Sequence, residues 1–148
     1  MKTSSRLIPV LDKARENEQA AAGVLADAAT RQEGAGQKLA ELEAYRNEYA
    51  EGLRYKTDAG LNALQMRDYQ AFLGRLDEAI RQQRQILEGL QAEAEQARQG
   101  WLQEKRHLSA LVKLNDKHRQ REYADDERRE QAETNEHALR RWQRAPGG

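Results

Sequence analysis

The sequence predicts an all-α protein folded as a long antiparallel two-helix coiled-coil hairpin. Of its 148 residues, 34% are charged, 38% are hydrophobic and only 5% are aromatic. The apolar residues are mostly Ala and Leu, a composition typical of long helices. Two stretches carry apolar residues at heptad spacing, with a short polar segment between them. Because each apolar stripe alone would face water, we expect the two helices to fold back on each other.

The first helix is expected over residues 5–54. Eleven of its fourteen a and d positions are apolar, which is typical of a left-handed coiled coil. Either Ser4 or Ser5 is expected to cap the first turn, and Pro9 is tolerable only within that turn. The fourteen positions are Leu7, Leu11, Ala14, Glu18, Ala21, Leu25, Ala28, Gln32, Ala35, Leu39, Leu42, Arg46, Tyr49 and Leu53.

A turn is expected over residues 55–68, with a short helix or turn at the tip. The polar stretch 55–60 contains possible caps in Thr57 and Asp58 and ends in Gly60. The second helix is expected over residues 69–142, where eleven of thirteen seam positions are apolar. These positions are Tyr69, Leu73, Leu76, Ile80, Gln83, Leu87, Leu90, Ala94, Ala97, Trp101, Glu104, Leu108 and Leu111.

A turn near residue 60 places Tyr49 beside Phe72. Beyond Leu114 the seam becomes polar, so we expect residues 115–144 to overhang without a partner helix, and 143–148 to be a disordered tail. The chain 1–148 is expected to be a single domain. Six glycines lie inside the expected helices, where each costs about 1 kcal/mol relative to Ala; they are Gly23, Gly34, Gly36, Gly74, Gly89 and Gly100.

Composition and motifs argue against several function classes. The 25 basic and 25 acidic residues are evenly spread, so no segment has the positive field that nucleic acid binding requires. No apolar run is long enough for direct membrane insertion, and the absence of Cys fits a cytosolic protein. The three histidines, His107, His118 and His137, lack metal-ligand spacing. We therefore expect no enzyme activity and no catalytic, cofactor-binding or metal site.

Two features leave alternatives open. The polar seam residues Glu18, Gln32 and Arg46 recur every fourteen positions, and they either fix the helix register or contact a partner. A group of mostly apolar residues near the turn is either a wider core or an exposed aromatic docking patch. On the first helix this group comprises Leu42, Tyr45 and Tyr49, and on the second it comprises Phe72, Leu76, Ala79 and Gln83.

Several segments resemble the FliJ family of flagellar type III export proteins, over about residues 5–142. The resemblance rests on the Tyr45/Tyr49 pair, on the segment Asp68-Tyr69-Gln70-Ala71-Phe72-Leu73 and on the tail Asp126-Glu127-Arg128-Arg129-Glu130-Gln131. The segments Leu7-Ile8-Pro9-Val10-Leu11 and Trp101-Leu102 add to it. It implies an antiparallel coiled coil similar to the central stalk subunit of rotary ATPases.

The resemblance also implies partners and a location. They are the flagellar export ATPase, the export gate membrane protein and export chaperones, with the chain cytoplasmic and peripherally associated with the inner membrane through the export apparatus. The seven residues near the turn would bind the export gate. The ATPase ring would face Arg128, Arg129, Arg140 and Arg141. The alternatives are a stalk protein of a virulence type III secretion system and a generic coiled-coil scaffold or homodimer.

Overall fold

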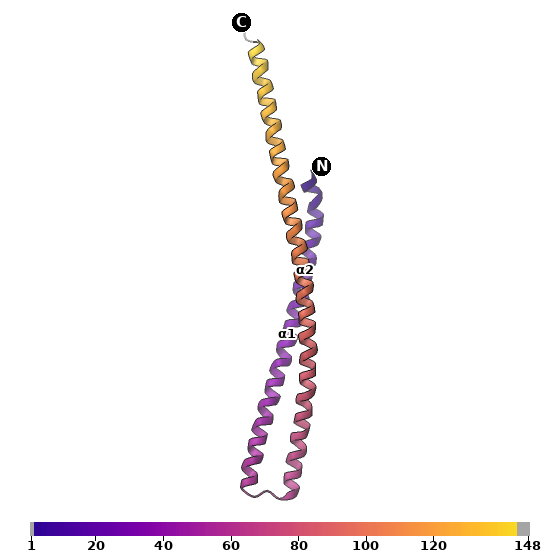
Figure 1. Cartoon of the computed structure of the whole chain (residues 1–148), viewed down its shortest axis with the longest axis vertical. Helices are drawn as coiled ribbons and strands as arrows, with labels where there is room; N and C mark the ends of the chain where they lie inside the picture. The colour runs from indigo at the N-terminus through magenta and orange to yellow at the C-terminus, as the bar shows by residue number, and fades with distance from the viewer. Residues whose placement is uncertain (1, 145–148) are drawn as a thin grey trace. The chain divides into compact units, whose positions relative to one another are not determined.

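The computed structural model describes residues 2–144, which form two long helices joined by a short loop (Figure 1). Helix α1 comprises Thr3–Asp58 and helix α2 comprises Ala63–Arg144. The helices are antiparallel, because Arg31 pairs with Glu93 while Arg46, further along α1, pairs with the earlier residue Asp77 on α2. The predicted all-α two-helix hairpin is confirmed.

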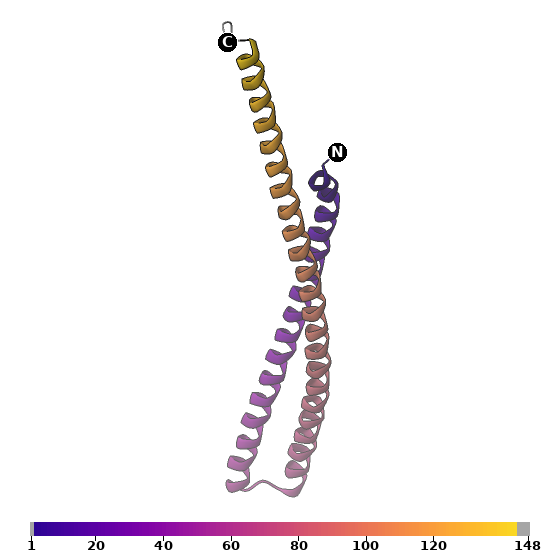
Figure 2. The same cartoon turned by 45° about the horizontal axis from the view of Figure 1, so that its top comes forward.

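The described residues divide into two compact units. The turn unit comprises Ala20–Leu102 and contains the loop with the adjoining parts of both helices (Figures 1 and 2). The terminal unit comprises residues 2–19 of α1 and residues 103–144 of α2. The expectation of a single domain stays a prediction.

The predicted seams form the interface between the helices. All fourteen seam positions of α1 and all thirteen of α2 are buried or half-buried. In the turn unit the most buried apolar residues are Ala28, Ala35, Leu76 and Ile80. In the terminal unit they are Leu11 and Ala14.

The connection between the helices is shorter than the turn expected over 55–68. Gly60 has a φ of 100°, a conformation that favours glycine, and its N–H donates to the Thr57 carbonyl at the end of α1. Asn62 caps α2, because its side-chain oxygen accepts from the Gln65 N–H at 2.8 Å while the Gln65 side chain accepts from the Asn62 N–H. This reciprocal capping box begins α2 at Ala63. Residues 63–68 therefore belong to α2 and form no separate tip helix.

The start of α1 also differs from expectation. The Lys2 carbonyl accepts from the N–H groups of Ser5 and Arg6, so Lys2 is the capping position and the helix begins at Thr3. The two serines thus lie inside the first turn, and neither is the cap. Pro9 becomes the seventh helical residue, beyond the turn in which its missing N–H has no consequence.

The overhang of α2 is shorter than predicted. In the terminal unit, Lys2 and Ser4 contact Asp126 and Glu122 of α2, so residues 115–126 do have a partner helix. Beyond them, all eighteen residues of 127–144 are exposed, and α2 continues past the start of α1 (Figure 2). Of the predicted disordered tail 143–148, Gln143 and Arg144 are helical, and the rest lies outside the described residues.

The antiparallel register predicts an intrachain crosslink in the turn unit. Cysteines replacing Leu25 and Ala97 lie at similar levels of the interface, close to the Arg31–Glu93 pair. Mild oxidation of this variant should give a monomeric disulfide, read by non-reducing electrophoresis and mass spectrometry. Cysteines at Leu25 and Leu87 are the control, because the second lies ten residues, or about 15 Å, from the matching level. Interchain products from the first pair would support the homodimer instead.

The helix glycines predict a gain in stability. A Cβ built on Gly89 or Gly100 meets no atom within 4 Å, so Gly89→Ala and Gly100→Ala should each raise the free energy of unfolding by about 1 kcal/mol. The matched control is Gly60→Ala, which should lower it by about 1 kcal/mol because of the positive φ. Urea unfolding followed by circular dichroism measures all three. Destabilisation by the two helix substitutions would contradict the expectation.

Candidate functional site

Four aromatic side chains meet near the loop, and we call them the tip cluster: Tyr45 and Tyr49 of α1, and Tyr69 and Phe72 of α2. Spacings of four and three residues place each pair on one face of its helix. The ring centroids of Tyr49 and Phe72 are 4.5 Å apart, and those of Tyr49 and Tyr69 are 5.0 Å apart. The predicted neighbourhood of Tyr49 and Phe72 is therefore confirmed.

Tyr45 links the tip cluster to the surface. Its ring meets the Phe72 ring edge to face, with an interplanar angle of 86° and a centroid distance of 6.2 Å. Such pairs contribute about 0.5–1.5 kcal/mol beyond the area that they bury. The Tyr45 side chain is nevertheless 49% exposed, whereas the other three rings are half-buried. The tip cluster thus combines the two alternatives, because it packs as core on one side and presents an aromatic edge on the other.

The other members of the predicted gate-binding set differ in how far they are buried. Leu42 and Ala79 are half-buried. Leu76 is only 8% exposed and Gln83 only 5% exposed, so the structure places both in the interface between the helices. The Gln83 side-chain nitrogen donates to the Ala35 backbone carbonyl of α1 at 3.1 Å. This contact satisfies a buried polar group, which would otherwise be costly.

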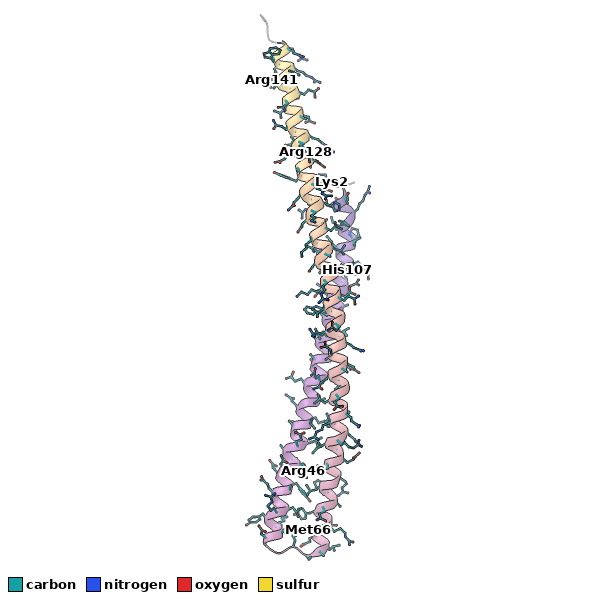
Figure 3. The ribbon with its side chains drawn as sticks, in the orientation of Figure 1. Lys2, Arg46, Met66, His107, Arg128 and Arg141 are labelled. Atoms are coloured by element: carbon teal, nitrogen blue, oxygen red, sulfur yellow. The ribbon has the colours of Figure 1, made fainter. Side chains whose placement is uncertain are left out.

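Ion pairs between the helices lie beside the tip cluster. Arg46 pairs with Asp77 at 2.9 Å, and Arg84 pairs with Glu43 at 3.0 Å (Figure 3 labels Arg46 on α1). Each pair is exposed and contributes little stability by itself. Arg46 occupies a seam position, and its pairing across the interface favours the interpretation that this polar seam residue fixes the register.

Sequence reasoning did not assign Tyr69 or Lys56 to the tip cluster. The Lys56 ammonium donates a hydrogen bond to the Tyr69 hydroxyl and lies 4.9 Å from the ring centroid. This hydrogen bond raises the pKa of Lys56. Tyr69 is the first position of the second seam, so its level on the hairpin was available from the heptad pattern. The contact made by Lys56 was not, because Lys56 lies outside the seam.

The four arginines predicted to face the ATPase lie on the exposed part of α2 (Figure 3 labels Arg128 and Arg141). Arg128 pairs with Asp125 at 2.9 Å, and Arg140 pairs with Glu136 at 2.7 Å. Within residues 2–144 the structure records no ion pair for Arg129 or Arg141. From His137 to Arg144 the helix carries three arginines and no carboxylate, which suits the negative end of the helix dipole.

The structure offers little for other chemistry. Among residues 2–144, no group of three or more His, Asp or Glu side chains could hold a metal ion. His107 and His137 are exposed and His118 is half-buried. Hydrogen bonds from Arg98 and Gln99 lower the pKa of Glu95 to about 2, but this is an exposed contact within one helix. In the same described range, no helix is long and apolar enough to cross a lipid bilayer.

Comparisons with known proteins identify the family. The profile described as "Flagellar FliJ protein" matches residues 2–147 of the chain. The flagellar FliJ protein of Escherichia coli (strain K12) is 28% identical over 140 residues, an alignment that covers 95% of each chain. No solved structure matches the chain. The family profile covers nearly the whole sequence, so the chain belongs to the FliJ family of flagellar export proteins.

Proposed function

We propose that this chain is a stalk-like subunit of the flagellar export apparatus that links the export ATPase ring to the export gate. It would also assist the handling of substrates and their chaperones. On this proposal it acts in the cytoplasm and meets the inner membrane only through the export apparatus. The observation that carries the proposal is the exposed stretch 127–144 of α2, which has no partner among the described residues of the terminal unit.

This exposed stretch is poorly suited to remain ordered alone. Fixing the backbone of one residue costs about 1–2 kcal/mol, and helices in proteins gain most of their stability from packing of an apolar face. The only large apolar side chains in the stretch are Leu139 and Trp142, which are 56% and 77% exposed. A surrounding protein ring would provide the burial that the hairpin does not, and it would present groups for Arg128, Arg129, Arg140 and Arg141.

The tip cluster supports the second contact of the proposal. Exposed aromatic groups are enriched in the cores of protein interfaces, and Tyr45 presents such a group beside a rim of ion pairs. The surface that we propose for the export gate comprises Leu42, Tyr45, Tyr49, Phe72 and Ala79. Leu76 and Gln83 support this surface from within the interface rather than contacting the gate.

Tyr45→Ala tests the gate surface. Because the Tyr45 ring is half exposed, its removal should lower affinity for the purified gate protein at least tenfold while helicity is retained. The binding is measured by titration calorimetry and the helicity by circular dichroism. The control is Tyr55→Ala, because Tyr55 is 78% exposed and lies outside the tip cluster. Equal binding by both variants would exclude Tyr45 from the gate surface. Loss of helicity in Tyr45→Ala would show that the ring acts as core.

Removing 127–148 tests the ATPase contact. The chain ending at Asp126 keeps the contacts of Lys2 and Ser4, so the hairpin should fold, lose binding to the export ATPase and keep binding to the gate. Binding to the ATPase is measured by co-sedimentation with the assembled ring, and binding to the gate by calorimetry. A full-length variant with Arg128, Arg129, Arg140 and Arg141 changed to Ala should weaken ATPase binding as well. Undiminished ATPase binding by the shortened chain would place the ring elsewhere.

A further inference from the structure

We propose that residues 2–8, Lys2 with the first residues of α1, form a strap that is hinged at Pro9, latched to α2 by Glu122 and Asp126, and released without unfolding of the rest of α1. All of these residues belong to the terminal unit. The proposal rests on three features of this unit, namely the cap on the first turn, the polar seam beneath it and the proline, and the titration of the capping carboxylates follows from the first.

The first turn of α1 is capped by the other helix. The first backbone N–H groups of a helix lack partners within it, and the first turn of α1 contains no acidic residue. Glu122 of α2 supplies the missing carboxylate. One of its oxygens accepts from the Ser4 N–H at 3.0 Å and the other from the Ser4 hydroxyl at 2.5 Å. A carboxylate is favoured here by the helix dipole.

A second contact lies one helical turn further along α2. The Lys2 ammonium pairs with the Asp126 carboxylate at 2.8 Å, with both side chains about half exposed. The first turn of α1 has no acidic residue of its own, so both contacts depend on carboxylates of α2. We call these two carboxylates the latch. The strap is therefore held mainly by polar contacts that solvent and protons can reach.

The seam beneath the strap supplies little apolar attachment. Leu11 and Ala14 are buried at 4% and 3% exposure, but both follow Pro9. Before the proline, Leu7 is half-buried and Ile8 is 53% exposed. On α2, the half-buried seam residues at the level of the strap are His118 and Glu122, which are polar. Polar side chains at these positions bury little apolar area, so closure of the strap gains little from the hydrophobic effect.

Pro9 separates the strap from the remainder of α1. It has no N–H to donate to the Ser5 carbonyl, and its ring crowds that carbonyl, so a proline inside a helix costs about 3 kcal/mol. Opening of residues 2–8 consequently breaks one backbone hydrogen bond fewer than opening of an ordinary helix end. It also relieves the crowding. The proline therefore sets the position at which release stops.

The latch carboxylates give release a definite pH dependence. Hydrogen bonds from Ser4 lower the pKa of Glu122, and the hydrogen bond and charge of Lys2 lower the pKa of Asp126. A group whose pKa is lowered in the closed state stabilises that state above its ordinary pKa. This stabilisation is lost as the pH falls through the lowered value. The strap should be closed at neutral pH and open progressively as the pH falls below about 4.

Other titratable and charged groups face the latch carboxylates and determine what happens when these carboxylates are protonated. From α1 the facing group is Lys2, whose pKa is raised by its bond to Asp126, so it stays protonated throughout this range. From α2 the facing groups are His118, Arg119, Tyr123 and Arg129. Once Glu122 and Asp126 are neutral, the positive charges of Lys2, Arg119 and Arg129 lack a counter-charge and repel each other. Release would uncover His118 and Glu122 on the same helix as the exposed stretch 127–144.

Amide hydrogen exchange of the full chain, followed residue by residue by NMR at neutral pH, tests the proposal. The variant Glu122→Gln with Asp126→Asn imitates the protonated latch. It should raise exchange at residues 4–8 at least tenfold and leave residues 11–19 unchanged. The matched control is Asp125→Asn with Glu127→Gln, which removes the same charge from neighbouring positions and should leave the strap closed. Equal acceleration in both variants, or none in either, would mean ordinary fraying and overturn the latch.

A second variant tests the hinge. Pro9→Ala restores the N–H, so it should slow exchange at residues 4–8, and in the latch variant the accelerated segment should then extend beyond residue 9. If the accelerated segment ends at the same residue with and without the proline, Pro9 is no hinge and that part of the proposal fails. In the wild-type chain, protection of residues 4–8 should also fall as the pH drops below about 4, and this pH dependence should be absent from the latch variant.

Discussion

A single interface between two helices carries the stability of each unit. A helix with one apolar stripe gains stability mainly by burying that stripe, and in a two-helix hairpin only one partner is available to cover it. The consequence is visible in the burial. The described core residues are mostly Ala and Leu, and even the best-buried among them retain some exposure. Any group that improves this interface, whether apolar or polar, therefore matters more than it would in a protein with a third layer.

Polar contacts fix the register between the two helices, which Ala and Leu alone cannot fix. The hydrogen bond from Gln83 to the Ala35 carbonyl and the pair of Arg46 with Asp77 each link one level of α1 to one level of α2 in the turn unit. A shift by one heptad would separate Arg46 from Asp77, so this ion pair exists in one register only. Apolar seam positions are more nearly interchangeable. The register thus depends on a few polar groups held in an otherwise repetitive seam.

Heptad spacing predicted the fold and most of the tip cluster, because the period of the apolar residues determines which helix face is buried. The position of Tyr49 beside Phe72 followed from that period and from the place of the turn. The helix ends did not follow from it. The capping box of Asn62 and Gln65 is a local pattern that apolar counting ignores, and it begins α2 before its first seam residue. The heptad pattern placed Gln83 in the seam but did not predict its hydrogen bond, since the partner is a backbone carbonyl of the other helix and has no residue signature.

The length of the overhang was also mispredicted because the prediction used only the apolar residues of the seam. Past Leu114 the seam of α2 turns polar, and an apolar criterion ends the pairing there. The helix pair nevertheless continues for another twelve residues, because Glu122 and Asp126 bind the first turn of α1 through charge and hydrogen bonding. The strength of such polar pairing depends on pH and salt. The strength of the apolar seam before it depends on them much less. The chemistry of the seam therefore divides the hairpin into a part that stays closed and an end that can be opened.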